Sequence, residues 1–100
     1  MPERAMSAWS LYLLRCADGS IYTGITTDVS RRLCEHQSGP RGSKYLRSRR
    51  PLQLLYQRRI GNRSLASRLE YQVRNLARKC KDDVATVDAL IDGLLSAGPE

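Results

Sequence analysis

Apolar and polar residues alternate along two segments near the start of the chain, residues 9–16 and 20–25. Alternation with a period of two is typical of strands that bury one face, so the sequence predicts two β-strands here. Between them, Ala17-Asp18-Gly19 favours a tight turn, because an Asp-Gly pair suits a hairpin connection. In this hairpin the core face carries Trp9, Leu11, Leu13, Ile21, Thr23 and Ile25, and the opposite face carries Ser10, Tyr12, Leu14, Tyr22 and Gly24.

The register of the hairpin depends on the turn. A type I turn with Gly19 in the left-handed conformation places Tyr12 opposite Gly24 and Leu14 opposite Tyr22. Both tyrosines then lie on one face of the sheet, whereas a slip of one residue would separate them. Because glycine has no side chain, Gly24 would leave room beside Tyr12 for a ligand to approach the backbone.

The rest of the pattern predicts three helices and one strand. Asp28 can cap a helix that runs to about Ser38, because Val29, Leu33 and His36 recur at helical spacing along one face. The later elements are a strand over 52–57, started by Pro51 and ended near Gly61, a helix over 64–79, and a last helix over 83–97 capped by Asp82 or Asp83. The order β-β-α-β-α-α predicts a small α/β (α+β) fold with a three-stranded, mainly antiparallel sheet and flanking helices.

Length and composition are those of one compact domain. The chain has 100 residues, 41% hydrophobic and 27% charged, which argues against disordered and membrane-spanning classes and predicts a soluble globule. We expect a loose N-terminus over 1–8 and a single domain over 9–97. No stretch has the length of a membrane span or a signal peptide, so we expect a cytoplasmic protein without a membrane partner. Three cysteines without a Cys-x-x-Cys pair argue against a disulfide framework and a structural zinc site.

Positive charge is concentrated in the first part of the chain. The formal net charge is +7, and residues 1–60 account for it, with eleven Arg or Lys against four Asp or Glu. One interpretation of this excess is a solvated loop. The other is a polyanionic partner, and the excess of Arg over Lys, fourteen to three, favours nucleic acid because guanidinium groups match phosphate geometry. The basic residues of segment 41–50, called the basic segment below, are Arg41, Lys44, Arg47, Arg49 and Arg50.

Several kinds of catalytic site are missing from the sequence. One histidine and scattered cysteines supply too few ligands for catalytic zinc. Neither a Walker-type phosphate loop nor a serine nucleophile elbow occurs, and we expect no small-molecule cofactor. Tyrosine, arginine and carboxylate groups remain. Five of the six aromatic residues are tyrosine and none is phenylalanine, so phenolic hydroxyls occur where a core would accept Phe.

Two short motifs and three later residues match a known pattern. The motifs are Ser10-Leu11-Tyr12 and, after a spacer of nine residues, Tyr22-Thr23-Gly24, followed by Arg32, His36 and Glu70. This combination resembles the GIY-YIG nuclease superfamily, most closely its short stand-alone bacterial branch, which looks like "YLLRCADGSIYTGIT". The resemblance covers about residues 9–80 and leaves out the helix over 83–97. Ser10, Leu11 and Thr23 depart from the Gly, Ile and Ile of the signatures, while both tyrosines and Gly24 are kept.

The resemblance implies a reaction and the residues that carry it. It implies a metal-dependent endonuclease that hydrolyses phosphodiester bonds of DNA, or of RNA, with low sequence specificity, in DNA repair or processing. Tyr12 and Tyr22 would flank the scissile phosphate, Arg32 would stabilise its charge, His36 would assist nearby, and Glu70 would hold one Mg²⁺ or Mn²⁺. The basic segment would grip backbone phosphates, contacts that position a nucleic acid without reading its sequence.

The role of the tyrosines stays open at this point. A free tyrosine has a pKa of about 10, so a general base near neutral pH needs that pKa lowered by up to ~3 units, equivalent to about 4 kcal/mol. Arg32 and a metal could together supply this. Alternatively, a tyrosine only orients the attacking water, and the metal activates it. The sequence does not distinguish whether Tyr12 or Tyr22 would be the base.

Each of these residues also has a purely structural interpretation. The tyrosines suit half-buried strands, His36 can pack at the edge of the core, and the stem of Arg32 can cover the apolar stripe. Glu70 can pair with Arg74 at i+4, although a lone carboxylate on a phosphate-binding face would repel the substrate unless a cation bridged them. These interpretations, with the departures in the signatures, support a second hypothesis: a catalytically weak or inactive nucleic-acid-binding module of the same fold, with tyrosines as stacking platforms. The oligomeric state stays open.

Overall fold

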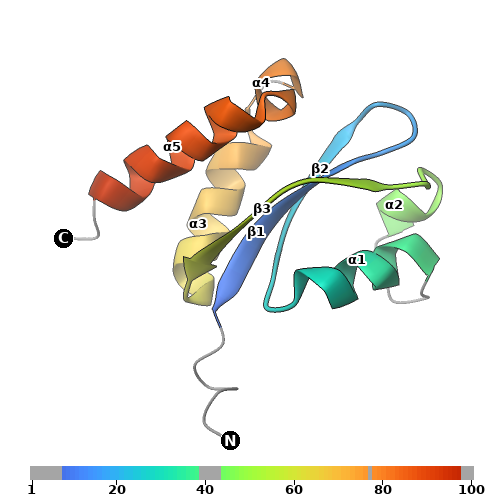
Figure 1. The fold of residues 1–100 in the computed structure, drawn as a ribbon, viewed down its shortest axis with the longest axis horizontal. Coiled ribbons are helices and arrows are strands. Elements are labelled where there is room, and N and C mark those ends of the chain that lie inside the picture. The colour runs from blue at the N-terminus through green and yellow to red at the C-terminus, as the bar shows by residue number, and fades with distance from the viewer. Residues whose placement is uncertain (1–7, 39–43, 77, 98–100) are drawn as a thin grey trace, which may run out of the picture.

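A three-stranded antiparallel sheet forms the centre of the protein, seen here in a computed structural model that describes residues 8–38, 44–76 and 78–97 (Figure 1). Its strands are β1 (Trp9–Arg15), β2 (Ile21–Thr26) and β3 (Gln53–Gly61), in the order β2-β1-β3. Both neighbouring pairs are antiparallel, as the sequence predicts. The central strand is β1, so β2 and β3 form the two edges of the sheet.

The hairpin between β1 and β2 has the predicted turn and register. Gly19 has a positive φ of 88°, the conformation that favours glycine. The observed register pairs Tyr12 with Gly24 and Leu14 with Tyr22. Both tyrosines therefore lie on the same face of the sheet, which confirms the prediction on which the candidate site depends.

Helices α1 (Val29–Ser38) and α2 (Lys44–Arg47) pack against the tyrosine face. Asp28 caps α1, because its carboxylate accepts the backbone N–H of Arg31 at 3.1 Å, as predicted. The four-residue α2 is not predicted from the sequence. The sequence predicts a core only on the face of the sheet that carries Leu11 and Leu13. The tyrosine face also has a core, because α1 and α2 cover it. Its buried residues are Tyr12, Leu14, Cys16, Leu46 and Leu52.

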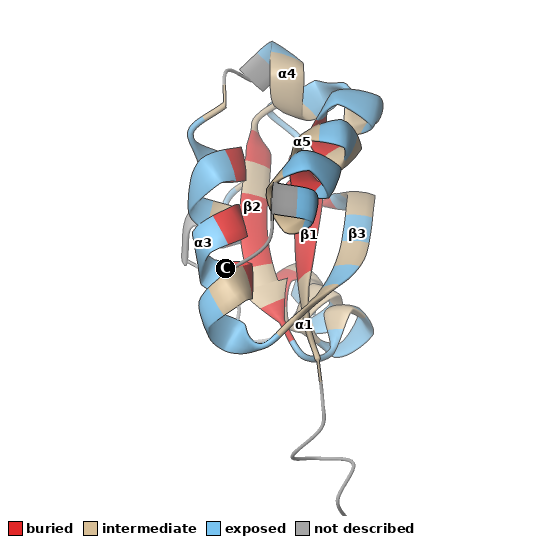
Figure 2. Cartoon of the chain, turned by 90° about the vertical axis from the view of Figure 1, so that its left-hand side faces the viewer, coloured by how far each residue is buried: buried red, intermediate tan, exposed pale blue. Residues whose placement is uncertain are grey.

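Helices α3 (Arg63–Arg74) and α5 (Val84–Ala97) pack against the other face of the sheet. Figure 2 views the molecule from this side, with α5 in front of β1 and α3 beside β2, and the red stretches of both strands are buried. The sheet is thus the middle of three layers. The core of this face consists of Leu11, Leu13, Ile21, Leu69, Val73, Val87 and Ile91.

The single helix predicted over 64–79 is in fact two helices. α3 ends at Arg74, and the short α4 (Arg78–Asp82) follows. Asn75 is the C-cap of α3: its side-chain amide donates to the carbonyl of Tyr71 at 2.9 Å, and the same carbonyl accepts the ordinary helical bond from the Asn75 backbone N–H. An Asn side chain that bonds the local backbone in this way competes with helix continuation.

The third strand runs to Gly61, near which the sequence predicts its end, and so extends beyond the residues 52–57 that carry the strand pattern. This extension contains two consecutive arginines, and the charge of Arg58 is neutralised by α5. Its guanidinium lies 3.0 Å from the carboxylate of Asp88 and 2.7 Å from that of Asp92. A distant helix therefore makes this charged stretch compatible with the sheet.

The last helix begins as predicted. The carboxylate of Asp83 accepts from the backbone N–H of Ala85 at 3.2 Å and from the hydroxyl of Thr86 at 2.9 Å, which caps α5. Within the described ranges, neither α5 nor any other helix has the length and apolarity to cross a membrane.

Candidate active site

Tyr12 and Tyr22 lie side by side on the face covered by α1. Their ring centroids are 6.3 Å apart. Tyr12 is only 2% exposed, whereas Tyr22 is partly exposed and lines a pocket. The two phenols therefore occupy different depths: Tyr12 belongs to the core, and Tyr22 reaches the surface of the site.

The missing side chain of Gly24 makes room for the Tyr12 ring rather than for a ligand. A Cβ atom at Gly24 would lie 2.5 Å from the Tyr12 hydroxyl oxygen and 2.6 Å from its Cζ atom. The phenol thus fills the space above the glycine, where the sequence predicts room for a ligand. The expected close approach at Gly24 exists, but the approaching group is a neighbouring side chain.

His36 joins the two tyrosines from α1. Its Nε2 atom lies 3.0 Å from the Tyr12 hydroxyl, and its ring packs edge-on against Tyr22 with centroids 5.5 Å apart. The residue is fully buried. Burial, together with the positive charges of Arg32 and Arg50, lowers the pKa of His36 to about 4. The imidazole is therefore neutral near pH 7.

Burial also governs the protonation of the phenols. It raises the pKa of Tyr12 and of Tyr22, because the anionic form of a phenol loses hydration in the core. The positive charge of Arg32 opposes this rise at both residues but is outweighed by burial. Both phenols therefore keep their protons at neutral pH.

Arg32 lies on the same helix as His36, one turn earlier. Its Nη1 atom donates to Glu35 at 2.8 Å, and Arg31 lies 3.6 Å from the same carboxylate. The side chain of Arg32 is 32% exposed, and its charge acts on both phenols. The guanidinium thus faces the tyrosine pair while Glu35 holds it in place.

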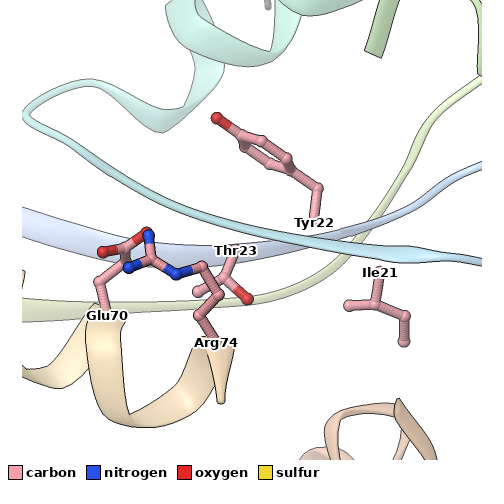
Figure 3. A pocket seen from close by; sticks show the side chains of 5 residues that line it. All are labelled: Ile21, Tyr22, Thr23, Glu70 and Arg74. Atoms are coloured by element: carbon pink, nitrogen blue, oxygen red, sulfur yellow. The ribbon is translucent and has the colours of Figure 1, made fainter. Parts of the chain in front are cut away.

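Glu70 approaches from the other side of the sheet. Figure 3 shows Tyr22 and the Glu70 carboxylate coming from opposite sides of β2. They nevertheless line one pocket of about 300 Å³, which lies at the edge of the sheet that β2 forms. The other lining residues are Ile21, Thr23 and Arg74. The structure therefore brings Glu70 and Tyr22 together, and it sets Tyr12, Arg32 and His36 next to Tyr22.

The pocket contains one carboxylate, and this carboxylate is paired. Arg74 donates to Glu70 at 2.8 Å, which is the i,i+4 ion pair that the spacing allows. The hydroxyl of Thr23 is buried in the pocket wall and has no hydrogen-bond partner. In the described parts of the chain, no group of three or more His, Cys, Asp or Glu could enclose a metal. One carboxylate and an unpaired hydroxyl suit Mg²⁺ or Mn²⁺, because Mg²⁺ keeps several waters and needs few protein ligands.

Two of these pocket residues, Thr23 and Arg74, were not identified as functional from the sequence. The signal for Thr23 is a polar residue on the core-facing side of a strand, where its hydroxyl needs a partner. The signal for Arg74 is its spacing of four residues from Glu70. In the sequence alone, that spacing is an alternative to metal binding and does not mark Arg74 as part of the site.

The basic segment lies next to the tyrosine face, where its described residues make structural contacts. The Nε of Arg49 donates to Asp18 in the hairpin turn at 3.1 Å, and the Nε of Arg50 donates to the backbone carbonyl of His36 at 2.7 Å. Arg47 ends α2 and is exposed. Lys44 begins α2, and Arg41 lies outside the described residues.

Comparisons with known proteins show which family the chain is similar to. The family model of the GIY-YIG catalytic domain matches residues 8–82. UPF0213 protein DP2720 of Desulfotalea psychrophila is 47% identical over 76 residues, which are 76% of this chain and 69% of that protein. UPF0213 protein YhbQ of Salmonella typhimurium is 45% identical over 92% of this chain and 91% of its own length.

A solved structure shows the same fold. The solution NMR structure of EF2693 from E. faecalis is 34% identical, covers 83% of this chain and 88% of that chain, and superposes with a TM-score of 0.57. The family match covers most of the chain and includes both tyrosines, Arg32, His36 and Glu70. The chain therefore belongs to the GIY-YIG family, whose catalytic domain is of the nuclease type.

Proposed function

We propose that the protein is a divalent-metal-dependent endonuclease that hydrolyses DNA phosphodiester bonds with low sequence specificity, in DNA repair or processing. One observation carries the proposal: Glu70 and Tyr22 come from opposite sides of β2 and line the same pocket. A carboxylate, a phenol and a nearby guanidinium are the groups that phosphodiester hydrolysis needs around the reacting phosphate.

The depths of the two phenols support different roles. Tyr22 lines the pocket and is the phenol that can contact a substrate or an attacking water. Tyr12 is buried behind it, against His36, and positions Tyr22 and the imidazole. Because burial raises the pKa of both phenols, we infer that Tyr22 orients water by hydrogen bonding, and that neither phenol is a general base in this state.

Arg32 and Glu70 supply the electrostatics of the proposed reaction. Arg32, next to both phenols, would stabilise the negative charge on the phosphoryl oxygens. Glu70 would hold one Mg²⁺ or Mn²⁺, with the hydroxyl of Thr23 as a contact for its hydration water. When bound, such an ion neutralises phosphate charge and lowers the pKa of water.

The basic segment would hold the DNA backbone beside this pocket. Arg50 supports this placement, because it bonds the backbone of His36, a residue of the site. Contacts to phosphates carry no sequence information, so we propose little sequence specificity. RNA remains an alternative substrate with the same backbone chemistry.

The proposal is tested by replacing Glu70 with Gln and measuring cleavage of duplex, branched and single-stranded DNA with Mg²⁺ or Mn²⁺. We expect cleavage to fall by about 100-fold or more, because the variant loses the only carboxylate among the pocket-lining residues. DNA binding should be kept or become tighter, since a negative charge is removed. Asp92→Asn is the matched control, because it also takes a carboxylate from an arginine partner, Arg58, but on α5.

Two results would contradict the proposal. Equal cleavage by the Glu70→Gln and wild-type proteins would remove Glu70 from the site. A wild-type protein that binds all three kinds of DNA but cleaves none of them with either metal would favour the non-catalytic module instead.

A further inference from the structure

Arg74 occupies the carboxylate on which the proposed function depends. Its Nη1 atom lies 2.8 Å from an Oε atom of Glu70, and both residues line the pocket. The side chain of Glu70 is 18% exposed, whereas that of Arg74 is 54% exposed. The acid is thus held in the pocket wall, while the arginine, with its long and solvated side chain, can change its partner.

The charges of the pocket favour such a change of partner if a metal binds. Among the five lining residues, Glu70 is the only acid and Arg74 the only base. Arg74 and a divalent cation would compete for this carboxylate, because two positive charges held against one carboxylate repel each other. Once the metal is bound there, the guanidinium of Arg74 would lie beside the pocket without its carboxylate, next to a metal that attracts phosphate.

The surroundings of Arg74 favour a phosphate as its next partner. Its charge acts on Tyr22, which faces the same pocket from the other side of β2, so the guanidinium lies within electrostatic reach of the proposed reaction centre. It also lies 5.9 Å from the ring of the exposed Tyr71, which can support the side chain outside the ion pair. A guanidinium binds phosphate oxygens through two parallel hydrogen bonds.

We propose that Arg74 is a substrate-binding residue that pairs with Glu70 in the metal-free protein and with a phosphate of the nucleic acid once Glu70 binds the metal. This inference rests on the proposed function. It assigns to one residue two successive partners of the same charge, the carboxylate and the phosphodiester. The ion pair keeps Glu70 compensated until both metal and substrate are present.

The inference is tested with Arg74→Met, Arg74→Lys and the control Arg68→Met, which removes the same charge from an exposed position of the same helix. The first readout is Mn²⁺ affinity of the DNA-free proteins by titration calorimetry. We expect Arg74→Met to bind Mn²⁺ about fivefold more tightly, the order of one partly exposed ion pair, because the competing cation is gone. Arg68→Met and Arg74→Lys should bind Mn²⁺ as the wild type does.

The second readout is DNA cleavage at saturating Mn²⁺. We expect Arg74→Met to cleave at least about tenfold more slowly, with Arg74→Lys restoring part of the rate and Arg68→Met matching the wild type. Unchanged Mn²⁺ affinity in Arg74→Met would overturn the competition for Glu70, and unchanged cleavage would overturn the phosphate contact. Failure of the proposed function looks different: the wild-type protein itself would neither bind Mn²⁺ nor cleave DNA, and the inference would fall with it.

Discussion

The contact between Gly24 and Tyr12 sets the geometry of the tyrosine pair. The Tyr12 ring cannot retreat from an added Cβ, because it is 2% exposed and packed among Leu14, Leu46 and Leu52. We therefore expect Gly24→Ala to lower the free energy of unfolding by about 1–3 kcal/mol, the cost of overpacking a core. It should also lower cleavage, since the phenol must move. Urea unfolding and a cleavage assay measure the two effects.

A second glycine provides the control for this prediction. Gly93 lies inside α5 and has no atom within 4 Å of the position of an added Cβ. Gly93→Ala should therefore raise the free energy of unfolding by about 0.5–1 kcal/mol, through helix propensity alone. If Gly24→Ala behaved like Gly93→Ala, the tight contact at Tyr12 would not exist.

His36 should make the stability of the protein depend on pH. Its pKa is about 4 in the folded protein, compared with 6.5 for an ordinary histidine. Between these values the unfolded chain binds more protons, so stability is present above pH 6.5 and is lost as the pH falls toward 4. From pH 7 to pH 5 we expect a loss of about 2 kcal/mol, measured by urea unfolding.

The single histidine makes this pH effect easy to isolate. His36 is the only histidine in the chain, so His36→Gln should remove the loss between pH 7 and pH 5 and leave only that of the carboxylates. An NMR titration of the same ring should place its pKa well below 6. Parallel pH profiles for the wild type and the variant would show that the imidazole is not buried in its neutral form.

Individual site residues were predictable wherever the chain encodes them locally. Asp18 and Gly19 define the turn, the turn defines the register, and the register puts Tyr12 and Tyr22 on one face. The pairing of Arg74 with Glu70 was visible as a spacing, but its place in a pocket with Tyr22 depends on where α3 packs. Such packing against a distant strand has no local signal in a sequence.

At the scale of the elements, boundaries depend on contacts that sequence patterns do not contain. The predicted caps at Asp28 and Asp83 are confirmed, because a cap acts on residues two or three positions away. β3 continues through Arg58 because aspartates of α5 pair with it, thirty residues later in the chain. The short α2 likewise has no periodicity long enough to recognise, and its position depends on Leu46 in the core.

The basic segment connects the hairpin turn to the candidate site, so its arginines have both structural and electrostatic roles. Arg49 donates to Asp18 through Nε and to Ser48 through Nη1, and Arg50 donates to the carbonyl of His36 through Nε. These bonds hold both positive charges beside the candidate site, where they would attract phosphate. We expect the double variant Arg49→Gln/Arg50→Gln to bind DNA more weakly. The slope of log affinity against log salt should fall by up to about 2, measured by fluorescence anisotropy.

Arg58→Gln is the control for the basic segment. Arg58 carries the same charge but is neutralised by Asp88 and Asp92 on the far side of the sheet from α1. Its replacement should leave the salt slope unchanged. An equal slope in the double variant and the wild type would remove Arg49 and Arg50 from the DNA-binding surface.

At the scale of the whole molecule, the sheet separates two cores with different contributions to the site. The core under α1 and α2 contains Tyr12 and surrounds His36. The core under α3 and α5 holds α3 against the sheet, and thereby positions Glu70 at the edge of β2. The order of strands and helices is enough to predict a sheet with flanking helices, so the fold class could be predicted. The core between the sheet and the helices α1 and α2 was not predicted.

α5 lies beyond the family match, which ends at residue 82, yet it completes the core that positions Glu70. Val87 and Ile91 of α5 are fully buried in the same cluster as Leu69 and Val73 of α3. We expect Ile91→Ala to lower the free energy of unfolding by about 2–5 kcal/mol, because it leaves a cavity between these helices. Ala89→Ser, at an exposed position of α5, should change stability by less than about 0.5 kcal/mol. Cleavage by the folded Ile91→Ala protein should also fall, because α3 loses part of its packing against α5. An unchanged free energy of unfolding in Ile91→Ala would show that α5 does not contribute to this core.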